Sequence, residues 1–169
     1  MSRRLPLLLA SLILVVSGRL VEARIQQREH LTEEEIDLIR EMQEIDLRID
    51  IFVRAAERRL LVLANPAASQ TKKEEEKWGP LPKGTKLQLL QDYKAILEEA
   101  MEKLDDAFER DKKSPALPKA LSKFKEGAAH QMPQLRALAP QMTEKKEQRA
   151  LLEAIEEAET ATKGEIKTQ

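Results

Sequence analysis

The sequence predicts an all-α protein: an antiparallel four-helix bundle with one long N-terminal helix and a kinked third helix. Aromatic residues make up only 3% of the chain, which leaves little material for strands, whereas abundant Leu, Ala, Glu and Lys favour helices. Apolar residues recur every three or four positions in four segments, as on the buried face of a helix. A long first connection and short later ones suit a bundle of consecutive antiparallel helices.

Residues 1–23 have the pattern of a secretory signal peptide. Arg3 and Arg4 precede an apolar run at positions 5–16, and Val21 and Ala23 place small residues where a signal peptidase cleaves. The run is shorter than the roughly 20 residues that cross a bilayer as a helix. We therefore expect export, cleavage before Arg24, no stable membrane span after cleavage, and a single helical-bundle domain at 24–169. Retention of the signal as an anchor is the alternative.

Charge and cysteine content limit the classes of function that this chain can have. The chain has 29 Lys and Arg against 30 Asp and Glu, and removing residues 1–23 leaves 26 against 29. The two signs alternate along every segment, so no basic stripe is available to neutralise phosphates, and we expect no nucleic-acid partner. The chain has no cysteine, so its stability must come from packing without disulfides.

The first predicted helix spans residues 32–64, about 32 residues and roughly 48 Å. Thr32 and Glu35 form a capping-box pattern at its start, and Asn65-Pro66 ends it. One face is apolar and is predicted to be core. The opposite face is charged and is predicted to be solvated: Arg40, Glu44, Arg48, Asp50, Arg54 and Arg58.

Residues 65–84 form the only long non-periodic stretch. Positions 72–77 can carry a frayed helical turn, but positions 78–84 contain two prolines and two glycines and are predicted to be loop. Loops of this length within a domain are either mobile or functional. This loop is therefore where we first look for a binding site.

Three further helices are predicted after the loop. The second begins at the Thr85 and Gln88 capping box and runs to about residue 109. The third begins at Ser114-Pro115 and meets Pro133, which predicts a kink or two short helices. The fourth begins at Thr143 and carries a thinner apolar stripe: Leu151, Leu152, Ile155 and Ala158.

No pattern in the sequence points to catalysis, a metal or a cofactor. The two histidines, His30 and His130, lack the Glu-x-x-His spacing of di-metal bundles and are expected to be ordinary surface residues. Acidic pairs at 98–99 and 105–106 diverge around a helix and are also expected to be solvated. Phosphate-binding loops and activated nucleophiles are missing. We expect a protein that is not an enzyme and that needs no cofactor.

Trp78 and Leu81 are the candidate partner contacts. The Pro-rich and Gly-rich loop can present the indole of Trp78 to a partner, or Trp78 can close one end of the bundle. Two functions remain open. One is a binding or scaffold protein of the cell envelope or extracellular space, engaging a protein partner or client. The other is a carrier of a small apolar ligand in the bundle core.

Overall fold

The computed structural model describes residues 29–164, so the predicted signal peptide lies outside the described residues. Within this range the ordered elements are all helices, which confirms the all-α prediction. Their bounds are α1 (Glu33–Glu41), α2 (Ile45–Ala64), α3 (Lys72–Trp78), α4 (Lys86–Arg110), α5 (Ala116–Ala137), the 3-10 turn η1 (Ala139–Gln141) and α6 (Lys145–Lys163). None of these helices is long and apolar enough to span a membrane.

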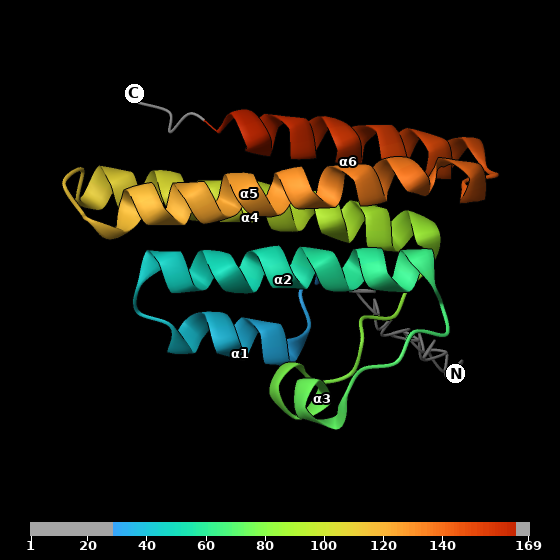
Figure 1. Cartoon of the computed structure of the whole chain (residues 1–169), viewed down its shortest axis with the longest axis horizontal. Coiled ribbons are helices and arrows are strands. Elements are labelled where there is room, and N and C mark those ends of the chain that lie inside the picture. The colour runs from blue at the N-terminus through green and yellow to red at the C-terminus, as the bar shows by residue number, and fades with distance from the viewer. Residues whose placement is uncertain (1–28, 165–169) are drawn as a thin grey trace, which may run out of the picture.

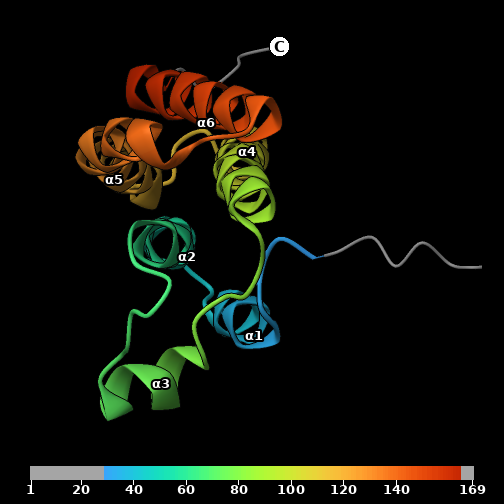
Figure 2. The same ribbon diagram turned by 90° about the vertical axis from the view of Figure 1, so that its right-hand side faces the viewer.

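The four long helices α2, α4, α5 and α6 lie side by side, and the chain reverses direction from each to the next (Figure 1). α2 packs on α4 and α5, and α6 packs on the same two helices from the other side (Figure 2). As a result, α2 and its neighbour α5 run in the same direction, as do α4 and α6. α1 and α3 lie outside this group, on the side of α2 that faces away from α6.

The predicted long N-terminal helix is wrong, because two helices occupy residues 33–64. Met42 leaves the helical region with ψ of 124°, and α1 folds back along α2 (Figure 1). No glycine or proline marks the break. The physical reason is the contact between Glu35 and Arg58. In one continuous helix these two residues would lie about 35 Å apart.

The core contains most of the apolar positions that the periodicity predicts. Phe52, Tyr93 and Phe124 are fully buried at its centre. Leu152 is an exception, because 61% of it is exposed on α6. Gln131 is a buried polar residue in this core, and it accepts a hydrogen bond from the Tyr93 hydroxyl (3.0 Å) while donating to the Val53 carbonyl (2.9 Å). It thereby links α2, α4 and α5.

The predicted helix starts are largely correct. Thr32 and Thr85 both form complete capping boxes, with Glu35 and Gln88 respectively. α6 begins one residue later than expected, with Glu144 rather than Thr143 at its N-cap. α5 is one helix that passes through Pro133, not two short ones.

Candidate functional site

A buried ion cluster lies between α1 and α2, and it consists of Glu35, Arg58 and Arg59. All three residues are at most 2% exposed. Glu35 Oε1 accepts a hydrogen bond from each guanidinium at 2.5 Å, while Oε2 accepts from the Thr32 amide at 2.9 Å as part of the capping box. One carboxylate therefore caps α1 and joins it to α2. The prediction that Arg58 lies on a solvated face is wrong.

The two arginines hold other parts of the chain against α2. Arg58 Nη2 donates to the carbonyls of Gly79 (3.1 Å) and Pro80 (2.6 Å). Arg59 Nη2 donates to the carbonyl of His30 at 2.6 Å. The ion cluster therefore holds both the entry to α1 and the exit from α3.

The charges in the ion cluster do not balance, because two guanidiniums share one carboxylate. Burial lowers the pKa of Arg58, and the neighbouring Glu35 acts in the opposite direction. The Nε atoms of both arginines are buried without a hydrogen-bond partner among the described residues. Among residues 29–164, Glu35 is the only carboxylate that hydrogen-bonds these guanidiniums, so the cluster depends on it.

Trp78 covers the ion cluster from outside. It is the last residue of α3 and is half-buried, and its ring centroid lies 5.9 Å from Arg58 Cζ and 5.2 Å from Lys77 Nζ. α3 lies beside the middle of the α1 and α2 pair rather than at an end of the long helices (Figure 1). Trp78 is therefore in contact with the side of α2 and does not close an end of the bundle.

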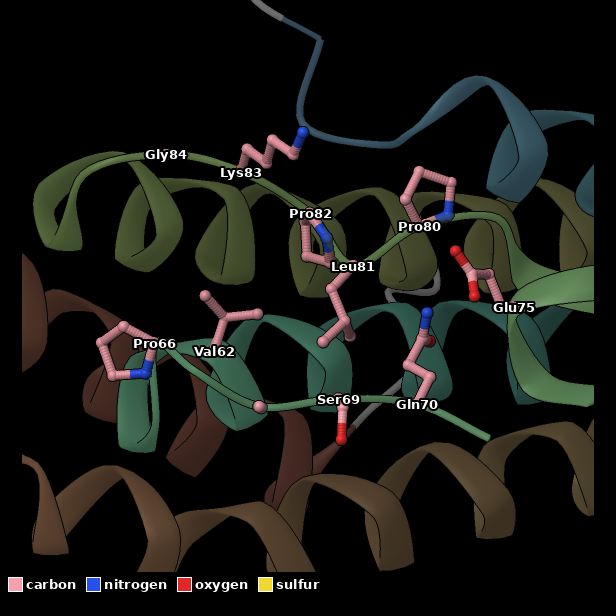
Figure 3. A pocket seen from close by; sticks show the side chains of 11 residues that line it. Val62, Pro66, Ser69, Gln70, Glu75, Pro80, Leu81, Pro82, Lys83 and Gly84 are labelled. Atoms are coloured by element: carbon pink, nitrogen blue, oxygen red, sulfur yellow. The ribbon is translucent and has the colours of Figure 1, made fainter. Parts of the chain in front are cut away.

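Beside the ion cluster, two extended segments enclose a groove of about 540 Å³. One segment, 66–70, leaves α2 through a turn at 66–67 and is extended from residue 68 on, and the other, 80–84, leads into α4; they run in opposite directions (Figure 3). We call this the side groove. Its lining residues are Val62, Pro66, Ala68, Ser69, Gln70, Glu75, Pro80, Leu81, Pro82, Lys83 and Gly84.

The side groove has an apolar floor and a fixed closed end. Val62 on α2 and Leu81 point into the space between the segments (Figure 3). Gln70 Nε2 donates to the Gly79 carbonyl at 3.0 Å and thereby bridges the two segments at one end. Gly79 can cap α3 there because its φ is +67°, where a side chain would be strained and would collide with Glu34. Because Arg58 binds the same carbonyl, the ion cluster fixes one wall of the groove.

Some main-chain groups along the side groove have no partner among the described residues. The amides and carbonyls of Ser69, Gln70 and Leu81 form no hydrogen bond within the described part of the chain. Ser69 and Gln70 also line a second groove of about 300 Å³, next to Arg54, Leu61 and Gln134. This short segment therefore presents extended backbone that is available to a partner.

The structure also locates the other candidate residues. Leu81 is half-buried and lines the side groove, whereas the Trp78 ring faces Arg58. The two predicted contact residues therefore do not share one site. His130 is exposed. His30 is not an ordinary surface residue, since its Nε2 lies 2.7 Å from Glu99 Oε2, and this contact lowers the pKa of Glu99. No group of three or more His, Asp or Glu residues suited to a metal ion occurs between residues 29 and 164.

Sequence reasoning missed the ion cluster, although one signal was present. Arg59 follows Phe52 by seven residues and Ala56 by three, which places it on the apolar face of α2. A charged residue on such a face needs a buried partner. The partner itself could not be found, because Glu35 already had a complete local explanation as a capping residue.

The described residues thus define an all-helical protein with a groove built from two extended segments on one flank. Comparison with protein-family models, with curated proteins and with solved structures finds no match to this chain.

Proposed function

We propose that this protein is an exported binding or scaffold protein that engages a protein partner or client through the side groove. In this proposal a four-helix bundle, with consecutive long helices antiparallel, is the rigid frame that carries the groove. The observation that supports it best is the combination of an apolar floor at Val62 and Leu81 with unpaired backbone at Ser69 and Gln70. A partner can satisfy both features at once.

The groove is suited to binding because its shape is held in place before a partner arrives. Arg58 fixes the carbonyls of Gly79 and Pro80, and Gln70 bridges to Gly79. Pro66, Pro80 and Pro82 restrict the backbone of both walls. A wall that is already ordered loses less entropy when it binds, which raises the affinity obtained from a small contact area.

The remaining parts of the proposal come from the sequence. The N-terminal pattern supports export to a periplasm or to the extracellular space. The alternating charges support a protein partner rather than a nucleic acid, and no residue pattern supports catalysis or a bound cofactor.

A carrier of a small apolar ligand is the second candidate, and the structure offers it less support. The core aromatics Phe52, Tyr93 and Phe124 are fully buried, and none of them lines the grooves described above. Extraction of the purified protein into organic solvent separates the two functions. A stoichiometric apolar molecule in the extract would favour the carrier.

Site-specific photocrosslinking tests the proposed function. A photoreactive residue replaces Ala68, a half-buried residue of the side groove, in the full chain with its N-terminal segment, and the cells are irradiated. The control replaces Leu152, which is also apolar but is exposed on α6, away from the groove. We expect a discrete adduct from position 68 and none of the same mass from position 152.

Two outcomes would contradict the proposal. One is the same set of adducts from both positions, which indicates contact by collision alone. The other is no adduct at position 68 while a partner is crosslinked elsewhere on the protein.

A further inference from the structure

We infer that the occupant of the side groove is an extended peptide segment with one aliphatic residue and one basic residue, which pairs with the backbone at Ser69 and Gln70. This inference rests on the proposed function and specifies the chemistry of the partner. It combines three features of the groove: unpaired backbone, a small apolar floor, and a carboxylate at one end.

The unpaired backbone favours an extended occupant. Ser69 and Gln70 lie in a non-helical segment, and the amides and carbonyls of these two residues have no partner among residues 29–164. The preceding amide, that of Ala68, already donates to the Asn65 carbonyl at 2.8 Å. The opposite wall is a poorer template, since Pro80 and Pro82 lack amide hydrogens. A peptide that runs alongside this segment can exchange main-chain hydrogen bonds with Ser69 and Gln70, as a strand does at a sheet edge. A helical occupant uses its own main-chain groups internally and cannot.

The floor favours an aliphatic side chain. Val62, Leu81 and Ala68 supply branched or small apolar surface, and Pro66 and Pro82 flank it. The groove volume of about 540 Å³ lies in the lower half of the range of roughly 300–1,000 Å³ that is usual for ligand pockets. The backbone of an extended segment and one aliphatic side chain fit such a space.

Glu75 favours a basic residue next to the aliphatic one. Its side chain points toward Pro80 at the end of the groove that Gln70 bridges (Figure 3). The Glu75 carboxylate forms no ion pair or hydrogen bond with another described residue. The other charged lining residue, Lys83, points away from Leu81 (Figure 3). A Lys or Arg of the peptide is therefore the complementary group at this end.

Selection from a displayed library of random heptapeptides tests the side-chain preference. We expect the peptides that bind the purified protein to share an aliphatic residue and a Lys or Arg at a constant spacing. Glu75→Lys should exchange the basic residue for Asp or Glu. The matched control, Glu76→Lys, changes an exposed neighbour that does not line the groove and should leave the preference unchanged.

N-methylation of the best peptide tests the backbone pairing. Since one main-chain hydrogen bond is worth about a factor of 10 in affinity, methylation of a paired amide should weaken binding by about 10-fold. Methylation of the adjacent amide, which points to the other side of an extended peptide, should have little effect. Equal effects at all amides, or none, would contradict an extended occupant.

The inference and the proposed function fail in different ways. A library that yields no common motif, together with a discrete crosslink from position 68, would overturn the peptide inference and leave partner binding at the groove intact. A common motif whose binding is unaffected by Leu81→Asp would place the peptide elsewhere and overturn the inference as well. Absence of both the motif and the position-specific crosslink would remove the proposed function itself.

Discussion

Glu35 is the residue on which the local structure depends most. It caps α1, neutralises part of the charge of Arg58 and Arg59, and through Arg58 supports the wall of the side groove. The two guanidiniums are fully buried, so losing their counter-charge leaves two uncompensated cations in a low-dielectric environment. The resulting decrease in the free energy of unfolding is far larger than the contribution of a surface ion pair.

We expect Glu35→Gln to lower the free energy of unfolding by about 3–5 kcal/mol, because glutamine keeps the size of the side chain but not its charge. Urea unfolding monitored by circular dichroism measures the change. The matched control is Glu33→Gln, an exposed residue in the same first turn, for which we expect a change below about 0.5 kcal/mol. Equal effects of the two substitutions would mean that the ion cluster contributes no more than a surface charge.

Asp46 links α2 to α5 and gives the protein a predictable dependence on pH. It is buried and forms ion pairs with Lys119 Nζ (2.7 Å) and Lys123 Nζ (3.1 Å), which together hold its pKa below the usual 3.8. A carboxyl whose pKa is lower in the folded state stabilises the protein above its unfolded pKa. This contribution is lost as the pH falls through the folded pKa.

We therefore expect Asp46→Asn to cost about 1 kcal/mol at pH 7, a modest value because Lys119 is largely exposed. The difference in unfolding free energy between wild type and variant should shrink as the pH falls below about 4. Chemical denaturation at a series of pH values measures it. A difference that stays constant down to pH 2 would show that the charge of Asp46 is not the cause.

Trp78 is half-buried over the Arg58 guanidinium, and this position determines how much it is expected to contribute to the free energy of unfolding. Truncation of a fully buried tryptophan to alanine lowers the free energy of unfolding by about 3–5 kcal/mol. We expect Trp78→Ala to lose about 1–2 kcal/mol, from partial burial and from the stacking on Arg58. Denaturant unfolding by circular dichroism measures the loss, with Trp78→Phe expected to recover part of it. A loss above about 3 kcal/mol would indicate a ring that is buried as a plug.

The reversal between α1 and α2 shows why the bounds of individual helices were harder to predict than the all-helical character of the chain. The apolar period continues across residues 42–44 without a glycine or proline, so the pattern predicts one helix. The break follows from a tertiary requirement, because only a reversed chain brings Glu35 to Arg58 and Arg59. α3 was underestimated for the opposite reason: its Thr71 and Glu74 capping box is a local signal in a segment that appeared to be dominated by breakers.

The contact between α2 and α5 is close because of Gly127. A Cβ atom at this position would lie 2.5 Å from Cγ1 and 2.8 Å from Cγ2 of Val53. Alanine normally stabilises a helix by about 1 kcal/mol relative to glycine, whereas overpacking of this kind costs about 1–3 kcal/mol. Val53 is branched at Cβ and has little freedom to move aside.

We expect Gly127→Ala to destabilise the protein by up to about 2 kcal/mol, as measured by urea unfolding. In a Val53→Ala background the same substitution should become neutral or stabilising, because the obstructing methyl groups are absent. A stabilising effect of Gly127→Ala in the wild-type background would show that the two helices are further apart than described.

At the scale of the whole molecule, the sequence predicted the class of fold and the region of the candidate site. Periodicity placed Phe52, Tyr93 and Phe124 in the core, and breaker residues marked residues 65–84 as the first place to look for a site, which is where the side groove lies. It could not predict the ion cluster or the groove, because both depend on residues that are distant in sequence and share no local pattern. Leu81 was identified from its loop setting, but its partner Val62 looked like any other helical residue.

The molecule divides into a frame and a flank that carries the side groove. α2, α4, α5 and α6 form the frame, and α1, α3 and the two extended segments lie on one side of it (Figure 2). Changes at the lining of the side groove should therefore alter the proposed binding with little effect on stability, whereas changes at the ion cluster or at the α2 and α5 contact should alter stability first.

Amide hydrogen exchange of the purified protein, with and without the partner recovered by crosslinking, tests the central claim most directly. The proposal predicts that the partner slows exchange at residues 67–71 and 81–84 and leaves α4, α5 and α6 unchanged. Protection confined to the outer faces of α4 and α6, with none in either extended segment, would contradict binding at the side groove.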